Sequence, residues 1–211
     1  LRHASASTVT MAVSGGGSPV RFFELLTQKP YADAIPWNRL TLCWVDERMV
    51  SSKHPHSNYR LAKQWLLRRA PLTAEQIFPM RTDFPTPEAA ALAYEQPLRQ
   101  IFPATDFPRF DLVVLGMGPD GHIASLFPGD SALEETARWV AAIPVPGMEP
   151  IVPRLTLTLP VLNRARRMLA LVPGAGKRDA FLDASTNLHS RLPAALLAPQ
   201  GEMTWLTCFH D

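Results

Sequence analysis

Short apolar runs alternate with longer amphipathic segments along the whole chain. The short runs are rich in β-branched and aromatic residues, which predicts buried strands. The segments between them carry apolar residues three and four positions apart, which predicts helices with one buried face. Such an alternation is typical of a mainly parallel sheet covered by helices. The predicted strands cover residues 8–14, 39–45, 110–116, 168–173 and 203–209, and the predicted helices cover residues 19–27, 57–70, 87–102 and 175–186.

The prolines fall mainly at the junctions between these segments. We find no internal repeat, low-complexity tract or long linker that could mark a domain boundary. A chain of 211 residues, of which 46% are hydrophobic, can bury a full core within one domain. We therefore predict a single domain over residues 1–211.

Charge and hydropathy exclude two classes of partner. The 21 basic and 19 acidic residues leave a net charge of only +2, so nucleic acid is not an expected partner. Every apolar run is shorter than the roughly 20 residues that cross a bilayer, so we expect no membrane span. The chain begins with Leu and its first ten residues lack the features of a signal peptide. We expect a cytoplasmic protein whose natural N-terminal element is missing.

Cysteine and histidine spacing does not indicate a metal site. Cys43 and Cys208 have no metal-like spacing, and we expect both to be reduced core residues. His54 and His56 lie two positions apart in a polar loop without a third convergent ligand, so we interpret them as surface residues.

The first candidate site segment is a strand that runs through Gly15, Gly16, Gly17 and Ser18 into a helix with proline in its first turn. Glycine lets a ligand approach the backbone closely, and a helix N-terminus presents free amide groups to an anion. This arrangement suits a phosphate group. A tight turn capped by Ser18 is an equally good explanation of this segment taken alone.

The second segment places Asp46, Glu47 and Arg48 directly after a predicted strand, where open α/β sheets usually bind ligands. The planar guanidinium of Arg48 matches phosphate or carboxylate oxygens, and Asp46 or Glu47 could orient it. A solvated ion pair at the strand end is the alternative. Asn58 precedes the next predicted helix and is most simply its N-cap.

The third segment contains Gly116, Gly118 and Gly121 in the spacing of a dinucleotide-binding fingerprint. The match is weak because Pro119 and Asp120 crowd the turn. Pro128 and Gly129 interrupt the expected helix, and no ribose-binding acid clearly follows. We favour a glycine loop that holds Asp120 and His122 at the end of a strand. A histidine titrates near neutrality and can take a proton from water, while a nearby carboxylate fixes its tautomer. A loop histidine bonded only to backbone is the alternative.

The fourth segment supplies Arg154 and Lys177, which could neutralise a phosphate held by the first loop. A cation at the start of a helix opposes the helix dipole, which favours an anionic ligand near Lys177. The alternative is an ordinary helix-start residue. We interpret Arg164, Arg166 and Arg167 as a solvated helix face without a functional role.

Four segments together closely resemble the 6-phosphogluconolactonases, in consistent order over residues 9–208. This family belongs to a wider group of sugar-phosphate isomerase-like folds that includes glucosamine-6-phosphate deaminases. The DER triplet and the DGH segment with its flanks make chance agreement remote. The matching segments are SGGGSP, WVDERMV with HPHSNYRLA, LGMGPDGHIASLFPG, and RLTLTLPVLNRARRMLALVPGAGK.

The resemblance implies a three-layer α/β/α sandwich around a mainly parallel, Rossmann-like sheet. It also implies hydrolysis of 6-phosphogluconolactone to 6-phosphogluconate in the pentose phosphate pathway, without a metal or other cofactor. The implied partner is the small phosphorylated sugar lactone, and we expect a monomer or small homo-oligomer. The base of the family falls on His122 with Asp120 beside it, and the phosphate-binding positions fall on Gly15, Gly16, Gly17, Ser18, Arg48, Arg154 and Lys177.

The chain departs from the family pattern where Gly17, Ser18 and Pro19 replace the usual Ser-Thr-Pro, which removes one hydroxyl from the loop. Three other functions stay open. The deaminases of this fold usually carry an acidic residue where this chain has Phe127, and ring opening needs that additional acid-base group. A non-catalytic sugar-phosphate sensor would have lost the base. A nicotinamide-dependent oxidoreductase rests on the glycine spacing alone.

Overall fold

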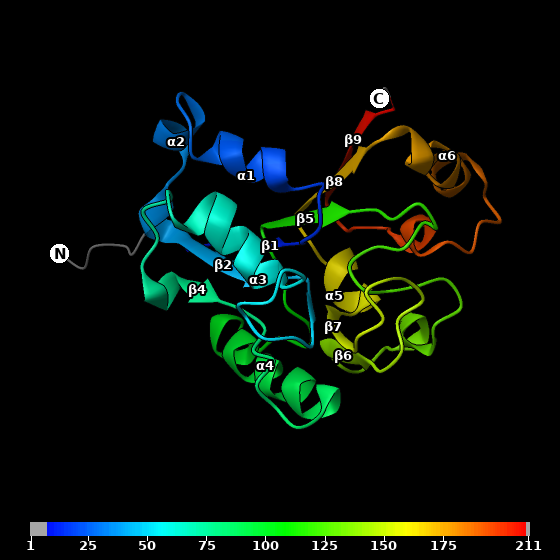
Figure 1. The fold of residues 1–211 in the computed structure, drawn as a ribbon, viewed down its shortest axis with the longest axis horizontal. Helices are drawn as coiled ribbons and strands as arrows, with labels where there is room; N and C mark the ends of the chain where they lie inside the picture. The colour runs from blue at the N-terminus through cyan, green and yellow to red at the C-terminus, as the bar shows by residue number, and fades with distance from the viewer. Residues whose placement is uncertain (1–7, 210–211) are drawn as a thin grey trace.

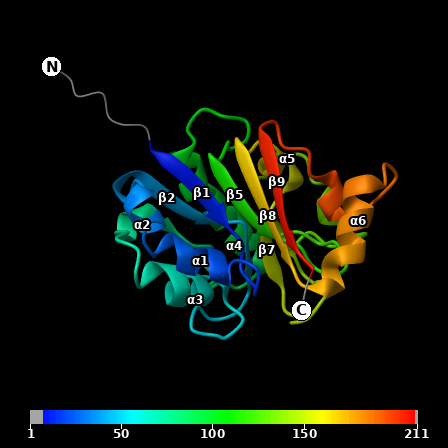
Figure 2. The same ribbon diagram turned by 90° about the horizontal axis from the view of Figure 1, so that it is seen from above.

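The computed structural model describes residues 8–209, so the predictions about the N-terminal segment LRHASAS lie outside the described residues. Six strands form one sheet in the order β4-β2-β1-β5-β8-β9, and every neighbouring pair is parallel. Figure 2 shows β2, β1, β5, β8 and β9 side by side. Their bounds are β1 Val9–Val13, β2 Leu40–Trp44, β4 Ile77–Phe78, β5 Leu112–Gly116, β8 Arg167–Pro173 and β9 Glu202–Cys208.

All five predicted strands are confirmed. Strand β2 is buried at each of its five positions, as expected for an inner strand of a parallel sheet. Strand β4 was not predicted because it contains only two residues. Cys43 lies in the buried β2, but the expectation that Cys208 is a core residue is wrong, because this thiol is exposed on β9, which forms an edge of the sheet.

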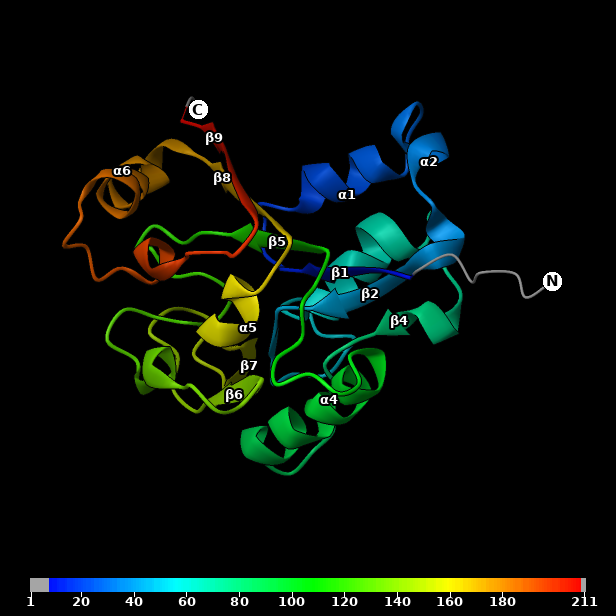
Figure 3. The same cartoon turned by 180° about the vertical axis from the view of Figure 1, so that it is seen from behind.

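The helices lie on both sides of this sheet. Helices α1 to α3 lie on one side, and α4 lies on the other (Figures 1 and 3). Helix α4 begins as the sequence predicts, since the Thr86 hydroxyl accepts a hydrogen bond from the Ala89 amide and Pro87 occupies the first turn. The bounds are α1 Val20–Leu26, α2 Tyr31–Ala34, α3 Asn58–Ala62, α4 Pro87–Ile101, α5 Leu159–Asn163 and α6 Arg178–Thr186.

A second, antiparallel sheet packs against α4 and was not predicted. Its order is β3-β7-β6, with β3 formed by the charged triplet itself. The strands are β3 Asp46–Arg48, β6 Val140–Ile143 and β7 Arg154–Leu157. Sequence patterns miss strands this short because three or four residues carry too little periodicity. The three-layer α/β/α architecture of a single domain is nevertheless confirmed, with the small sheet added to one outer layer.

Two predicted helices differ from the structure. The helix predicted over residues 57–70 is regular only to Ala62 and continues as a π-helix over Lys63–Leu67. The supposed helix face of Arg164, Arg166 and Arg167 does not exist, because α5 ends at Asn163 and Arg167 begins β8. No helix within residues 8–209 combines the length and hydropathy that a bilayer span requires.

The parallel direction of the strands brings four separate loops to one edge. Strands β1, β2, β5 and β8 all end at the same side of the sheet, and β1 lies between β2 and β5. The glycine loop, the charged triplet, the DGH segment and the loop before α6 follow these four strand ends. Open α/β sheets bind ligands at this edge.

Candidate active site

A cavity of about 160 Å³ lies at this edge. All the predicted site residues except Arg154 and Asp120 line it, and Asp120 contacts it through His122. The DGH motif therefore shares a wall with the predicted phosphate loop. The lining residues are Ser14, Gly15, Gly16, Gly17, Ser18, Asp46, Arg48, Gly116, Met117, Gly118, Pro119, His122, Ala124 and Lys177.

The glycine loop passes so close to Asn58 that no side chain fits at Gly15. A Cβ atom on Gly15 would lie 1.8 Å from Asn58 Oδ1. Gly16 has a positive φ of 77°, which a side chain would strain. Both positions therefore require glycine. Because glycine has no side chain, a ligand in the cavity can approach the backbone of the loop directly.

Ser18 and Lys177 meet across the cavity mouth. The Lys177 ammonium donates a hydrogen bond to the Ser18 hydroxyl at 3.0 Å. Burial lowers the pKa of Lys177 from its ordinary value. The alternative in which Ser18 caps α1 is wrong, since Pro19 holds the N-cap position and no side chain caps this helix. A half-buried cation beside a bare glycine loop favours an anionic ligand.

Two of the three fingerprint glycines, Gly118 and Gly121, are required by the local backbone and side-chain geometry. A Cβ on Gly118 would lie 2.1 Å from His122 Nδ1 and 2.6 Å from Asp120 Oδ1, so only glycine leaves room for the pair. Gly121 has a positive φ of 78°. No helix follows β5, because Met117 and Ile123 instead form an antiparallel bridge that closes a tight loop. The glycine spacing is therefore not the strand–turn–helix fingerprint on which the dinucleotide alternative rested.

His122 and Asp120 form a short hydrogen-bonded pair. The distance from His122 Nδ1 to Asp120 Oδ1 is 2.6 Å, and the same oxygen accepts from the His122 amide at 3.2 Å. Burial opposes ionisation of Asp120, but the hydrogen bonds and charge of His122 outweigh it and hold the pKa of this carboxyl below its ordinary value. An ionised Asp120 can accept a hydrogen bond from Nδ1–H of His122, an arrangement in which the lone pair of the neutral imidazole lies on Nε2.

The aromatic ring of Phe127 packs beside the imidazole. The two ring centroids are 4.8 Å apart, and the guanidinium carbon of Arg154 lies 5.0 Å from the Phe127 centroid. Phe127 is buried. Phe127 stands where the deaminases usually carry an acidic residue, and it presents an apolar ring to His122.

Arg48 lines the cavity, but neither neighbouring carboxylate orients its guanidinium. Its Nη1 donates to the carbonyl oxygen of His56 at 2.8 Å, and its Nε is buried without a partner among the described residues. Glu47 instead accepts hydrogen bonds from the amides of Asn58 and Tyr59 at 2.7 and 2.8 Å. The role suggested for Glu47 in orienting Arg48 is wrong, because its side chain anchors the start of α3.

Arg154 does not line the cavity, although it was predicted to bind phosphate. Its side chain is buried and Nη2 donates to the carbonyl oxygens of Met148 and Pro150 at 2.8 and 3.3 Å. Arg154 stands directly opposite Arg48 in the β3–β7 pairing. Burial, followed by the charge of Arg48, lowers the pKa of Arg154. Like charges on opposed strands are destabilising unless an anion or carboxylate compensates them.

Sequence reasoning missed the part that Asn58 plays. Ser57 is the N-cap of α3, and Asn58 is the buried residue that follows it. Its Nδ2 donates to the carbonyl oxygen of Asp46 at 2.9 Å, while its Oδ1 lies against Gly15. Asn58 thus joins the charged triplet to the glycine loop. No local pattern could have indicated this, because both contacts are distant in sequence.

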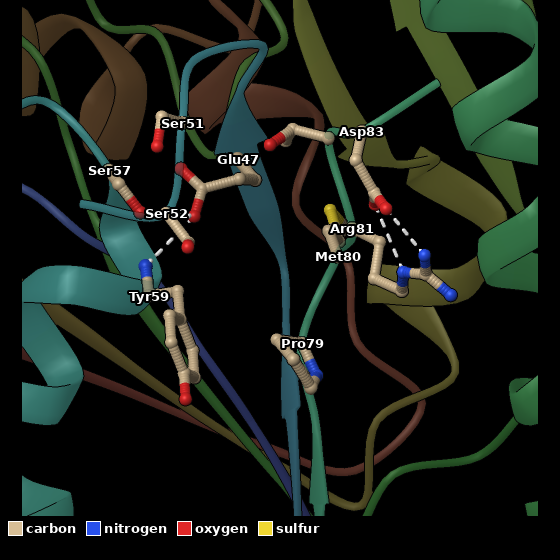
Figure 4. Close-up of a pocket in the computed structure, with 10 residues that line it drawn as sticks. Glu47, Ser51, Ser52, Ser57, Tyr59, Pro79, Met80, Arg81 and Asp83 are labelled. Atoms are coloured by element: carbon tan, nitrogen blue, oxygen red, sulfur yellow. Dashed lines mark hydrogen bonds and ion pairs between the residues drawn. The ribbon is translucent and has the colours of Figure 1, made fainter. Parts of the chain in front are cut away.

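A larger cavity of about 620 Å³ lies on the other side of β3 (Figure 4). Successive residues of a strand point to opposite faces, so Asp46 and Arg48 line the small cavity while Glu47 lines the large one. In the large cavity Arg81 forms an ion pair with Asp83, and Glu47 accepts hydrogen bonds at the start of α3. Its lining contains none of the predicted site residues, and no group of three potential metal ligands occurs within residues 8–209.

Comparison with known proteins agrees with this geometry. Residues 2–205 match the family model described as glucosamine-6-phosphate isomerases/6-phosphogluconolactonase. The chain belongs to this family. A 6-phosphogluconolactonase of Synechocystis is 40% identical over 201 residues, which cover 93% of this chain and 80% of the relative. A probable chloroplastic 6-phosphogluconolactonase 3 of rice is 39% identical and matches 97% of this chain, which spans 65% of the rice protein's length.

Solved structures of the family have the same fold. The 6-phosphogluconolactonase of Thermotoga maritima superposes with a TM-score of 0.83 at 32% identity, covering 96% of this chain and 86% of the other. A monomeric glucosamine-6-phosphate deaminase superposes with a TM-score of 0.80 at 18% identity, which shows the fold alone. The resemblance seen in the sequence is therefore confirmed at the level of family and fold.

Proposed function

We propose that this protein hydrolyses 6-phosphogluconolactone to 6-phosphogluconate, the lactone-opening step of the pentose phosphate pathway, with His122 as general base. The observation that carries this proposal is the His122–Asp120 pair at 2.6 Å beside a cavity lined by a bare glycine loop and a half-buried lysine. The names of the relatives support the same substrate. One base, one water and one anion site suffice for this reaction.

The phosphate would bind where the cations and bare amides converge. In the proposed complex, Lys177 leaves or shares its bond to Ser18 and contacts the phosphate together with the loop at Gly15 to Ser18. Arg48 has donors to spare, since only Nη1 has a hydrogen-bond partner among the described residues. Buried Arg154, opposite Arg48 on β7, adds positive charge beside the cavity without lining it. Binding energy from this remote group orients the lactone carbonyl.

The imidazole then acts on water. Asp120 holds the proton on Nδ1, so Nε2 of His122 takes a proton from the water that attacks the carbonyl carbon. The tetrahedral intermediate collapses by breaking the bond between the carbonyl carbon and the ring oxygen. The imidazolium returns its proton to that oxygen, which becomes the hydroxyl of the open acid. Atoms and charge balance without any further reactant.

The direct test compares lactone hydrolysis by the wild type and H122A in the presence of a metal chelator, against the spontaneous rate. General base catalysis typically contributes about 10²–10⁴-fold, so kcat should fall by about this factor while KM changes little. H189Q is the matched control, because His189 is exposed and does not line the cavity. Undiminished turnover by H122A would remove His122 from the mechanism.

The wild type itself tests the substrate. Acceleration that persists in chelator supports metal-independent lactone hydrolysis. If the folded protein gives no acceleration, the proposed function is wrong, and deamination of amino-sugar phosphates becomes the next activity to measure. The apolar wall of Phe127 against His122 argues against deamination, because it occupies the position of the additional acid.

A further inference from the structure

Asp46 lines the cavity, and one of its two carboxylate oxygens has no hydrogen-bond partner among the described residues. Its side chain lines the cavity and the residue is only 3% exposed. Oδ2 accepts a hydrogen bond from the Ser125 hydroxyl at 2.9 Å. Oδ1 is buried and has no hydrogen-bond partner among the described residues. The positive charge of Arg154 partly compensates that of Asp46, but a buried carboxylate oxygen without a donor is still costly and calls for an explanation.

The position of this carboxylate is rigidly held. The backbone oxygen of Asp46 accepts from Asn58 Nδ2, and its strand pairs with β7 opposite Thr156. Ser125, which holds Oδ2, is completely buried. Asp46 cannot swing away to find another donor without breaking these contacts. The fold therefore holds Oδ1 in a fixed position with its hydrogen-bond acceptor capacity unused.

The chemistry of Oδ1 restricts what it can bind. A carboxylate repels phosphate and accepts hydrogen bonds, so its partner must be a donor. A metal ion would need further oxygen ligands, and no such cluster is found in residues 8–209. A neutral hydroxyl group satisfies the oxygen at no cost in charge. The lactone of the proposed reaction offers free hydroxyls on C2, C3 and C4.

We propose that Asp46 is a specificity-determining residue that accepts a hydrogen bond from one of these ring hydroxyls through Oδ1. This inference rests on the proposed function for the identity of the substrate. Lys177 and the glycine loop select the phosphate, and Asp46 selects a hydroxylated ring over a deoxygenated one. Asp46 takes no proton in this role. A site built to bond a hydroxyl rejects an analogue that lacks it, because its own polar group is then left unpaired.

The test measures kcat/KM for 6-phosphogluconolactone and its 2-, 3- and 4-deoxy analogues, with the wild type and D46N. In D46N the single amide oxygen takes the Ser125 hydroxyl, so the amide NH₂ faces the substrate and cannot accept a hydrogen bond. Hydrogen bonds to charged groups predict that one deoxy analogue loses about 10–100-fold with the wild type. The same analogue should lose less than about 3-fold with D46N. Equal losses with both proteins, for all three analogues, would overturn the inference.

D111N is the matched control. The Asp111 carboxylate also accepts hydrogen bonds, from the Thr10 amide and hydroxyl at 2.9 Å, but it precedes β5 and so lies at the opposite edge of the sheet. D111N should keep the wild-type discrimination even if it unfolds at a lower temperature. A loss of discrimination in D111N would mean that general destabilisation causes the effect.

Binding separates this inference from the proposed function. Calorimetry with 6-phosphogluconate and its deoxy forms requires no turnover. If the wild type fails to hydrolyse the lactone but binds the acid with a hydroxyl preference that D46N lacks, the proposed function fails and the role of Asp46 stands. If the wild type hydrolyses the lactone and D46N keeps the full preference, the inference alone fails. Binding without any hydroxyl preference, or no binding at all, also overturns it.

Discussion

The ammonium of Lys177 donates a hydrogen bond to the hydroxyl of Ser18 at 3.0 Å, although 159 positions separate the two residues. Ser18 follows β1 and Lys177 follows β8, with β5 between these strands in the sheet. No carboxylate within residues 8–209 forms an ion pair with this lysine. The hydrogen bond to Ser18 therefore positions the Lys177 ammonium, and its positive charge is available to pair with an anionic ligand.

We predict that K177M weakens substrate binding without weakening folding. A charged hydrogen bond to phosphate predicts a rise in KM of about 10–100-fold. Because burial lowers the pKa of Lys177, the protonated amine costs stability in the folded state, and K177M should unfold at a higher temperature at neutral pH. Phosphate should stabilise the wild type but not the variant. Thermal unfolding with and without inorganic phosphate measures both effects, and K63M, at an exposed position, serves as control.

Replacement of Gly118 should separate His122 from Asp120 while leaving both side chains chemically unchanged. A Cβ in G118A would lie 2.1 Å from His122 Nδ1, so the imidazole must leave its bond with Asp120. We predict a fall in kcat of about 10²-fold or more, with a smaller change in KM. Steady-state kinetics measures this split. G176A is the control, because a Cβ there meets no atom within 4 Å, and an equal loss in G176A would contradict the explanation.

The acid stability of the protein should depend on Asp120. Its pKa lies below the ordinary value in the folded state, since the bonds and charge of His122 outweigh burial. A carboxyl of this kind stabilises the fold above its unfolded pKa of about 4, and this stabilisation is lost as the pH falls through the folded pKa. The side chain is 31% exposed, so solvent screening keeps the contribution below about 1 kcal/mol.

The measurement is the unfolding free energy of the wild type minus that of D120N at a series of pH values. We predict a positive difference at neutral pH that shrinks as the pH falls below about 4. A difference that grows in acid would contradict the sign of the shift. D120N should also lose turnover by about 10²–10⁴-fold, because an amide that donates to Nδ1 favours the tautomer protonated on Nε2.

The contact between Gly15 and Asn58 predicts an intolerant loop position. G15A would place a Cβ 1.8 Å from a buried oxygen, and overpacking of this kind costs about 1–3 kcal/mol. We expect chemical denaturation to show this loss and kinetics to show a raised KM. G17A is the control for stability, since a Cβ on Gly17 meets no atom within 4 Å. A second change, N58G, should recover part of the stability in G15A by removing the obstructing side chain.

Much of the fold could be predicted from the sequence because its signals are local. Buried apolar runs such as residues 110–116 need only their own composition to indicate inner strands of a parallel sheet. Strand β3 gave no such signal, since Asp46, Glu47 and Arg48 are charged and become a strand only by pairing with β7. Residues 63–67 do show helical periodicity. Apolar spacing does not distinguish an α-helix from a π-helix over so few residues, so their π-helical hydrogen bonds could not be predicted.

The sequence by itself determined which chemical groups are present and the short-range geometry among them. Asp120 and His122 are two positions apart, so their pairing needs only a tight glycine loop. The tertiary structure decided every relationship between distant segments. It joined Lys177 to Ser18 and set Asn58 against Gly15, and it buried Arg154 beside the cavity where the sequence had suggested direct contact with the ligand. These outcomes depend on strand order and register, which arise from packing of the whole core and leave no trace in local spacing.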